Sequence, residues 1–296
     1  MQNKHIPVLL AETLTALQPQ ATHWYVDATF GRGGHTQALL DSGAYVIAFD
    51  WDMEAIQFGK TAFEKQIAAG NLILINESFS NMSTEIKQLK KKLPDLEISG
   101  VLFDFGTSSN QLTSAQRGFS FTGEGQLDMR MDTRLGVTAK DILAVVPESQ
   151  LADLFIEFGG EEEAKNIAKA IKSAKTPITT TTELSSLIVS VKKRTKPGIH
   201  PATKVFQALR IAVNSELDEI TTALPHAFSL LKPGGVLATI SFHEGEDRIV
   251  KQQFKAWESN KKGKLLSAKP IGASIDELEE NNRARSAKLR AIRKNI

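Results

Sequence analysis

The stretch V-D-A-T-F-G-R-G-G-H-T, residues Val26 to Thr36, decides the fold. A short apolar run ends in an acid, turns on three glycines and continues into a predicted helix. Glycine lets the backbone approach a ligand closely, and a helix N-terminus offers free N–H groups. The spacing is G-x-G-G rather than the G-x-G-x-x-G of a dinucleotide pyrophosphate site. The stretch predicts the first strand-to-helix turn of an α/β fold, which either cradles a nucleotide-like ligand or is simply tight.

The first hundred residues alternate between short apolar runs and helical segments. Strands are predicted at 24–28, 45–50, 71–76 and 98–105, separated by helices at 35–41, 54–68 and 82–92. Continuous apolar strands are expected when helices cover both faces of a parallel sheet. The pattern predicts a doubly wound, Rossmann-like sheet.

The alternation breaks in the middle of the chain and resumes later. Residues 108–203 read as helical and polar, with a basic, Pro- and Gly-containing loop at 192–204. Strand-like sequence returns at 236–242, after the turn L-K-P-G-G. We therefore expect a discontinuous sheet domain at 1–107 and 204–296, with an inserted helical domain at 108–203. Further helices are predicted at 151–158, 161–174, 182–192, 206–224 and 246–257.

Composition excludes several classes of function. No apolar run approaches the 18 residues or so of a membrane span, and the start lacks a signal-peptide core, so a cytoplasmic protein is expected. The absence of cysteine excludes disulfides, cysteine-ligated zinc and a thiolate nucleophile, including the covalent route to cytosine-C5 methylation. No metal site is expected. The net charge of +2 is too small to indicate nucleic-acid binding by itself.

Three side chains at or after predicted strand ends indicate which class of ligand the fold binds. Asp50 follows the first glycine by about twenty residues, where a carboxylate can accept both ribose hydroxyls. Alternatively, Asp50 is a solvated acid in a turn or the cap of the next helix. Phe79 can lie against an adenine ring or in the core, and Asp104 ends the fourth strand at the crevice. With the late L-K-P-G-G-V-L-A-T-I-S-F segment, typical of methyltransferase sheets, they favour S-adenosylmethionine over a nicotinamide dinucleotide.

The C-terminal sixteen residues are basic and contain no acid. Such a tail is either a solvated end or a phosphate-binding segment that makes binding salt-sensitive. Its cations are Arg283, Arg285, Lys288, Arg290, Arg293 and Lys294.

Nine segments spread from the first ten residues to the last ten carry a more specific signal. They are H-I-P-V-L-L-A-E (5–12), D-A-T-F-G-R-G-G-H-T (27–36), D-F-G-T-S-S-N-Q-L (104–112), R-G-F-S-F (117–121), L-D-M-R-M-D (127–132), H-P-A-T-K-V-F-Q-A-L-R-I-A-V-N-S-E-L (200–217), I-S-F-H (240–243), E-D-R-I-V-K (246–251) and R-A-R-S-A-K-L-R-A (283–291). In these segments the chain resembles the small-subunit ribosomal RNA (cytosine-N4) methyltransferase H family.

The resemblance implies a class I methyltransferase sheet and methyl transfer from S-adenosylmethionine to the exocyclic N4 of one cytidine in the decoding region of 16S rRNA. It implies the small ribosomal subunit as partner of a monomer or homodimer. The implied cofactor contacts are Gly33, Gly34, His35, Asp50, Phe79, Asp104 and Gln111. The chain departs from the family pattern at Phe105, Thr113, Gln126, the run 158–161 and Glu244-Gly245, which puts details on the substrate side in doubt.

An aromatic exocyclic amine is a poor nucleophile, so the enzyme must orient it, align it with the methyl group and accept a proton. We expect Asp104, Asp128 and His243 to serve these steps, although His243 could be a strand-end histidine bonded to backbone and 128–132 a salt-bridge set. The base must leave its stack, and Phe119 and Phe121 could support it or belong to the core. The expected phosphate contacts are Arg117, Arg130, Lys192, Lys193, Arg194, Arg283 and Arg285.

Three other functions compete. A nicotinamide oxidoreductase would need a proton relay such as Y-x-x-x-K, but both tyrosines, Tyr25 and Tyr45, lie in predicted early strands. A non-enzymatic ribosome-assembly factor would have no use for a cofactor crevice. A methyltransferase acting on a non-RNA acceptor is opposed, apart from the resemblance, only by the helical insertion and the basic tail.

Overall fold

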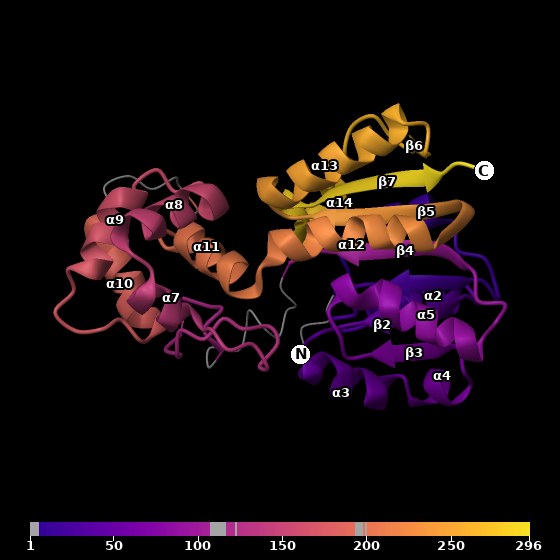
Figure 1. The fold of residues 1–296 in the computed structure, drawn as a ribbon, viewed down its shortest axis with the longest axis horizontal. Coiled ribbons are helices and arrows are strands. Elements are labelled where there is room, and N and C mark those ends of the chain that lie inside the picture. The colour runs from indigo at the N-terminus through magenta and orange to yellow at the C-terminus, as the bar shows by residue number, and fades with distance from the viewer. Residues whose placement is uncertain (1–5, 107–116, 122, 193–197, 199) are drawn as a thin grey trace. The chain divides into compact units, whose positions relative to one another are not determined.

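The computed structural model describes residues 6–106, 117–121, 123–192, 198 and 200–296. The chain forms two compact units, one made of Met1–Gly106 and Leu217–Ile296 and the other of Thr107–Glu216. The first contains the sheet and the second is helical (Figure 1). The sheet unit is discontinuous in sequence, and the helical unit is inserted between its two parts.

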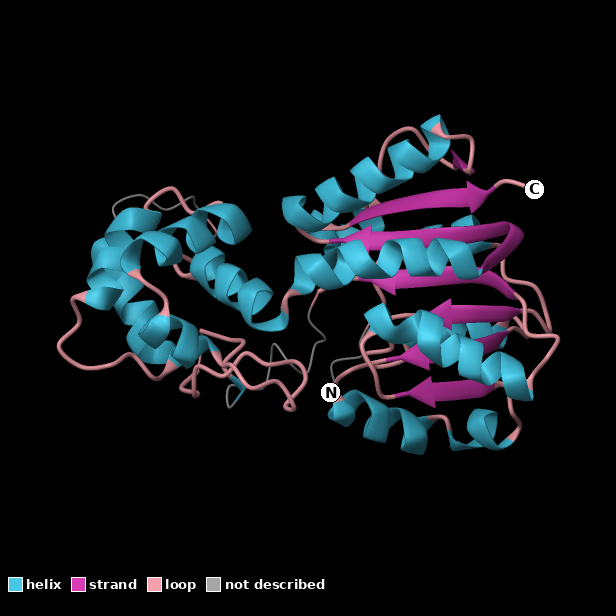
Figure 2. Ribbon diagram, viewed as in Figure 1, coloured by secondary structure: helices cyan, strands magenta, loops and turns pink. Residues whose placement is uncertain are grey.

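In the described part of the sheet unit, seven strands follow the order β3-β2-β1-β4-β5-β7-β6 (Figure 2). The first five strands in this order are parallel, whereas β7 runs antiparallel to both β5 and β6. This is the predicted Rossmann-like class I methyltransferase sheet. The strands are β1 (Trp24–Asp27), β2 (Tyr45–Phe49), β3 (Leu72–Ile75), β4 (Ile98–Asp104), β5 (Leu231–Ser241), β6 (Gly263–Leu265) and β7 (Lys288–Lys294).

Helices cover both faces of the sheet, which explains why its central strands are apolar throughout. On one face lie α5 (Met82–Lys92), α12 (Glu216–Leu230) and α13 (Glu244–Ser259), packed on a core that includes Phe103 and Phe254 (Figure 1). The other face is covered by α1 (Leu10–Leu17), α2 (Gly34–Asp41), α3 (Met53–Ala62), α4 (Glu64–Ala68) and the 3-10 helix η3 (Asn282–Ser286). The order of strands reverses between β1 and β4, so the carboxyl ends of these two strands mark the expected ligand crevice.

The basic C-terminal segment is a strand rather than a free tail. β7 pairs with β5 on one side and β6 on the other, and Leu289, Ala291 and Ile292 are buried. Arg290 forms an ion pair of 2.7 Å with Asp247 of α13. The apolar alternation in K-L-R-A-I-R-K was the available signal for this strand, and the density of cations obscured it.

The inserted unit is built from helices with well-defined starts. Its helices are α7 (Ala139–Val145), α8 (Glu148–Gly159), α9 (Ala164–Lys172), α10 (Thr181–Val191) and α11 (Thr203–Asn214). Thr138 and Thr180 begin α7 and α10 with capping boxes. A Cβ at Gly159 would lie 2.3 Å from the carbonyl oxygen of Lys204, so α8 and α11 approach closely there.

This close packing places α11 in the inserted unit, and the boundary therefore differs from the predicted return to the sheet at residue 204. The predicted single helix 206–224 is divided as well, because Ser215 adopts a left-handed conformation with φ 48° that ends α11. The predicted helix 54–68 is similarly divided at Phe63 into α3 and α4. Hydrophobic periodicity continues across both breaks and does not reveal them.

Candidate active site

The glycine turn lies between β1 and α2, and two of its glycines are required by their surroundings. Gly33 has φ 71°, and a Cβ there would lie 2.7 Å from the ring of Phe63. A Cβ at Gly34 would lie 2.4 Å from Cγ of Pro7. Pro7 therefore packs directly on the start of α2, beside the glycine turn. Sequence reasoning matched the H-I-P motif that contains Pro7 to the family without giving it a role.

Asp50 follows β2 and ties that strand end to the glycine turn. The N–H of Gly31 donates to Oδ2 of Asp50 and the N–H of Asp52 donates to Oδ1, each at 2.8 Å. Burial raises the pKa of Asp50 from 3.8 to about 7, because desolvation outweighs these two hydrogen bonds. The carboxyl group thus titrates close to neutral pH, at the position predicted to hold ribose hydroxyls.

This pKa makes cofactor affinity depend on pH. The raised pKa keeps Asp50 protonated below neutral pH, whereas the carboxylate form accepts both ribose hydroxyls. Affinity for S-adenosylmethionine should therefore rise about tenfold between pH 6 and pH 8, as the ionised fraction rises. Calorimetric titration at both pH values checks this. An Asp50→Asn variant that keeps the full pH dependence would contradict the assignment.

A buried polar network connects the ends of β1 and β4 with the start of α2. The Thr36 hydroxyl donates to Oδ2 of Asp27 at 2.7 Å, and the Thr29 N–H donates to Oδ1. The Asp104 N–H in turn donates to the Thr29 hydroxyl at 2.7 Å. Burial raises the pKa of Asp27 above its ordinary value. Sequence reasoning assigned no role to Asp27, Thr29 or Thr36, although all three lie within or beside the quoted motif.

His35 is buried beside Asp104, with Nε2 3.6 Å from Oδ2 of the carboxylate. Within the described residues, the two ring nitrogens of His35 have no hydrogen-bond partner. Oδ1 of Asp104 has none there either. Burial lowers the pKa of His35, but the carboxylates of Asp104, Asp27 and Glu277 together raise it above 6.5. Buried polar groups without partners are costly, and these lie where a polar ligand is expected. The site therefore combines an imidazole whose raised pKa favours its protonated form with the carboxylate of Asp104.

Aromatic rings gather at the carboxyl ends of β2, β3 and β4. Phe79 begins a 3-10 helix after β3 and is only half-buried. Its ring centroid lies 5.4 Å from that of Phe103 and 6.0 Å from that of Trp51. Phe79 thus packs on the core, as the second interpretation expects, and its contact with an adenine ring stays a prediction. Trp51 was missed, and its position directly after Asp50 was the available signal.

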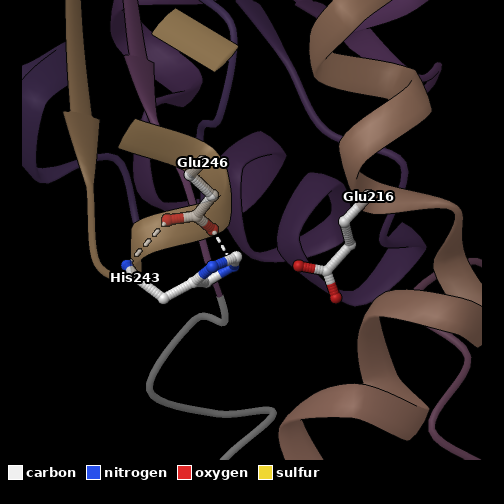
Figure 3. Close-up of side chains that lie close together, drawn as sticks. All are labelled: Glu216, His243 and Glu246. Atoms are coloured by element: carbon white, nitrogen blue, oxygen red, sulfur yellow. Dashed lines mark hydrogen bonds and ion pairs between the residues drawn. The ribbon is translucent and has the colours of Figure 1, made fainter. Parts of the chain in front are cut away.

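His243 follows the carboxyl end of β5, at the same edge of the sheet as Asp104, because Asp104 pairs in register with Ile240 of β5. It is the N-cap of α13: its Nδ1 accepts the Gly245 N–H, and its own N–H donates to Oε2 of Glu246 (Figure 3). Since Nδ1 accepts, the proton of the neutral ring lies on Nε2, 3.1 Å from Oε1 of Glu246. These contacts correspond to the alternative of a strand-end histidine bonded to backbone.

Gly245, one of the departures from the family pattern, faces the same ring. A Cβ at Gly245 would lie 3.1 Å from Cε1 and Nδ1 of His243. Glycine therefore leaves room for the imidazole to cap the helix, whereas any side chain with a Cβ would require the ring to shift slightly. Glu244, the neighbouring departure, is exposed and accepts a hydrogen bond from Lys288 at 3.0 Å.

A segment before β7 reaches the glycine turn from the C-terminal side. Helix α14 (Ile275–Glu280) places Glu277 so that its Oε1 accepts the Leu9 N–H at 2.8 Å. Asn281 donates to the Ile6 carbonyl at 3.2 Å. Arg283 follows in η3, and burial lowers its pKa against the opposing charge of Asp104. The segment thus joins Arg283 electrostatically to the crevice, whereas Arg285 is exposed.

Asp128 and Arg130 of the inserted unit are paired with each other. The Arg130 guanidinium donates to both carboxylate oxygens of Asp128 and holds the pKa of that carboxyl below its ordinary value. Arg130 also donates to the carbonyls of Thr133 and Leu135, and Arg117 donates to two carbonyls of the same loop. These contacts correspond to the salt-bridge interpretation of the run.

The remaining sequence-predicted residues are divided by what the structure describes. Lys192 is nearly buried and its Nζ lies 2.7 Å from Oε2 of Glu161. Phe121 stacks on His200 with centroids 4.4 Å apart, and Phe119 is buried, as expected for packing residues. Gln111, Lys193 and Arg194 lie outside the described residues.

Among the described residues, no helix is both long and apolar enough to cross a membrane.

Comparison with known proteins identifies the family of this chain. The sequence matches the MraW methylase family over residues 2–295. Ribosomal RNA small subunit methyltransferase H of Caldicellulosiruptor bescii is 43% identical, covering 98% of this chain and 99% of its own, and that of Sinorhizobium fredii is 45% identical, covering 97% and 86%. A solved rRNA methylase from Streptococcus thermophilus aligns over 99% of this chain and 100% of its own, with 11% identity and a TM-score of 0.47. The chain belongs to the MraW methylase family.

Proposed function

We propose that this protein transfers a methyl group from S-adenosylmethionine to the exocyclic N4 of a cytidine in the decoding region of 16S rRNA. Family membership and relatives named as small-subunit rRNA methyltransferases support methylation of rRNA. The observation that carries the proposal is the cluster of the glycine turn, Asp50, His35 and Asp104 at the point where the strand order reverses.

The residues present fit S-adenosylmethionine. Asp50 would accept the ribose hydroxyls, and Phe79 with Trp51 would border the adenine. Gly33, Gly34 and His35 would hold the methionine end, because the glycines admit close approach and the His35 ring has hydrogen-bonding atoms without partners. Gln111 is proposed from the family motif alone. When bound, the cofactor supplies a methyl group on a cationic sulfur.

The protein's own groups would then orient the amine and receive its proton. Asp104 is partly exposed at the end of β4 and can accept a hydrogen bond from the amino group, which turns its lone pair toward the methyl group. Asp128 and His243 are proposed as further orienting groups. Their pairing with Arg130 and Glu246 means that each would act through a side chain held in place.

The proposed partner is 16S rRNA in the small ribosomal subunit, contacted by Arg117, Arg130, Lys192, Lys193, Arg194, Arg283 and Arg285. Of these, Arg285 is exposed, whereas Arg117, Arg130 and Lys192 make internal contacts. We propose a cytoplasmic location, because ribosomal subunits are the proposed substrate. We also propose that the protein is a monomer or homodimer.

The role of His243 can be separated from its role as a cap. Asparagine is also a good N-cap, so His243→Asn should leave the unfolding free energy within about 0.5 kcal/mol of wild type. If the imidazole acts on the target base, kcat should fall by about tenfold or more, as for loss of a general acid–base group. Steady-state methyl transfer with denaturant unfolding checks both. Unchanged kcat would leave His243 with the capping role alone.

The experiment that tests the function is transfer of labelled methyl from S-adenosylmethionine to small subunits that lack this modification. Large subunits and a generic protein acceptor serve as controls. Label in the RNA of small subunits alone supports the proposal. Cofactor binding without label in RNA would contradict it and favour a non-RNA acceptor or an assembly factor.

A further inference from the structure

A row of basic side chains follows the solvent-facing side of α13. Arg248, Lys251 and Lys255 are three and four residues apart, so at 3.6 residues per turn they share one face of the helix. Arg248 and Lys255 are exposed and Lys251 is half-buried, whereas Val250 and Phe254 bury the opposite face. α13 is the last helix of its layer and lies beside β6 and β7 (Figure 1).

The row continues past the end of the helix. Lys261 and Lys262 are exposed in the turn that leads to β6. We call Arg248, Lys251, Lys255, Lys261 and Lys262 the α13 basic row. At a rise of about 1.5 Å per residue it extends for roughly 20 Å, long enough to follow several nucleotides of one strand.

The acids near this row are engaged elsewhere. Glu244 and Asp247 are paired with Lys288, and Asp247 also with Arg290 of β7. Oε1 of Glu258 accepts the Leu265 N–H at 3.1 Å. In the part of the chain that the structure describes, no side chain of the α13 basic row forms a hydrogen bond or ion pair. Glu244 and Asp247 lie four residues before Arg248 and Lys251, the spacing of an intrahelical ion pair, but their carboxylates pair with Lys288 instead.

The position of the row relates it to the reaction. α13 begins at His243, directly after β5, whose carboxyl end lies beside that of β4 with Asp104. The first cation, Arg248, is little more than one turn into the helix, and the others lead away from this edge. A strand whose base reached the crevice could therefore continue along α13 with its phosphates beside the row.

We propose that the α13 basic row binds backbone phosphates of the substrate rRNA without reading its sequence. The proposal rests on the function proposed above; Arg248 and Lys251 lie in the E-D-R-I-V-K segment (246–251), but none of the five residues is among the phosphate contacts expected from the sequence. Unlike Arg130 and Lys192, whose head groups are held by internal contacts, these five head groups are available to a ligand. Phosphate contacts of this kind position a nucleic acid and make binding depend on salt.

The test compares a triple variant, Arg248→Gln, Lys251→Gln and Lys255→Gln, with a control that removes the same charge from α5, Lys87→Gln, Lys90→Gln and Lys91→Gln. The control lysines are also exposed on a helix of the same layer. The full-length protein, saturating S-adenosylmethionine and unmodified small subunits are used at 50 and 200 mM salt. Losing three phosphate contacts should reduce the slope of log affinity against log salt by about 2 to 2.7.

Over this range wild-type affinity should therefore fall about 20- to 40-fold more than that of the triple variant. The KM for subunits should rise in the variant at low salt, while kcat at saturation, cofactor affinity and the control stay at wild-type values. A triple variant with the wild-type salt slope would overturn the proposal. So would weaker binding to subunits with unchanged binding to protein-free 16S rRNA, which would assign the row to an acidic ribosomal protein. Failure of the proposed function itself is distinguishable, because wild type would then not methylate subunits at all.

Discussion

Replacing Asp104 with asparagine should lower kcat/KM for methyl transfer by about 10- to 150-fold. This corresponds to the loss of about 1.5–3 kcal/mol, the usual contribution of a hydrogen bond to a charged group. Asp104 is the carboxylate at the crevice whose Oδ2 lies 3.6 Å from His35, and asparagine keeps its shape while removing its charge. The same change removes the strongest influence raising the pKa of His35, so that pKa should fall. Initial rates and an NMR titration of His35 provide the two measurements.

The control for this variant lies at the opposite end of the same strand. Asp95 is exposed three residues before β4, and Asp95→Asn removes the same charge far along the strand from the crevice. It should leave both kcat/KM and the pKa of His35 unchanged. Equal activity of the Asp104→Asn variant and wild type would show that the crevice carboxylate takes no part in orienting the amine or the cofactor.

Replacing Gly33 with alanine should greatly lower the affinity for S-adenosylmethionine and destabilise the sheet unit. The left-handed φ of 71° costs about 1–2 kcal/mol for a residue with Cβ, and the contact of 2.7 Å with Phe63 adds about 1–3 kcal/mol of overpacking. The start of α2 must therefore move, and the affinity for S-adenosylmethionine should fall at least about tenfold for each 1.4 kcal/mol lost in the bound geometry. Trp24, Trp51 and Trp257 all belong to the sheet unit, so fluorescence-detected unfolding reports on that unit alone.

Gly70 provides a matched control for the backbone strain. It follows α4 with φ 76°, and a Cβ there would meet no atom within 4 Å. Gly70→Ala should therefore cost only the conformational term of about 1–2 kcal/mol and leave cofactor affinity unchanged. If Gly33→Ala loses no more stability or affinity than Gly70→Ala, then the close packing of the glycine turn is not what shapes the cofactor site.

The sheet could be predicted from the sequence because its strands are short apolar runs that end at polar or glycine-rich turns. The parallel strands β1 to β4 lie within one or two residues of their predicted ranges. β7 was not predicted, because a strand with a cation at every second or third position reads as a basic tail. Two of its cations, Lys288 and Arg290, pair with Asp247, which is distant in sequence, and Lys294 donates to the carbonyls of Ser229 and Leu231. Such compensation depends on tertiary structure.

The candidate site was predictable where a motif ends a strand or starts a helix. Asp50, Asp104 and the glycine turn lie at the predicted edge of the sheet, since topology alone places them there. Contacts that cross the chain were not predictable: Pro7 on Gly34, and Glu277 on the Leu9 N–H. These contacts join residues more than 25 apart in sequence, and no local periodicity records them.

The most direct test of the account is nucleoside mass spectrometry of 16S rRNA after reaction with S-adenosylmethionine and unmodified small subunits. The account predicts N4-methylcytidine at a single position in the decoding region, strongly reduced with Asp104→Asn and unchanged with Asp95→Asn. A methyl group on another atom or nucleoside, or full product from the Asp104→Asn variant, would contradict it.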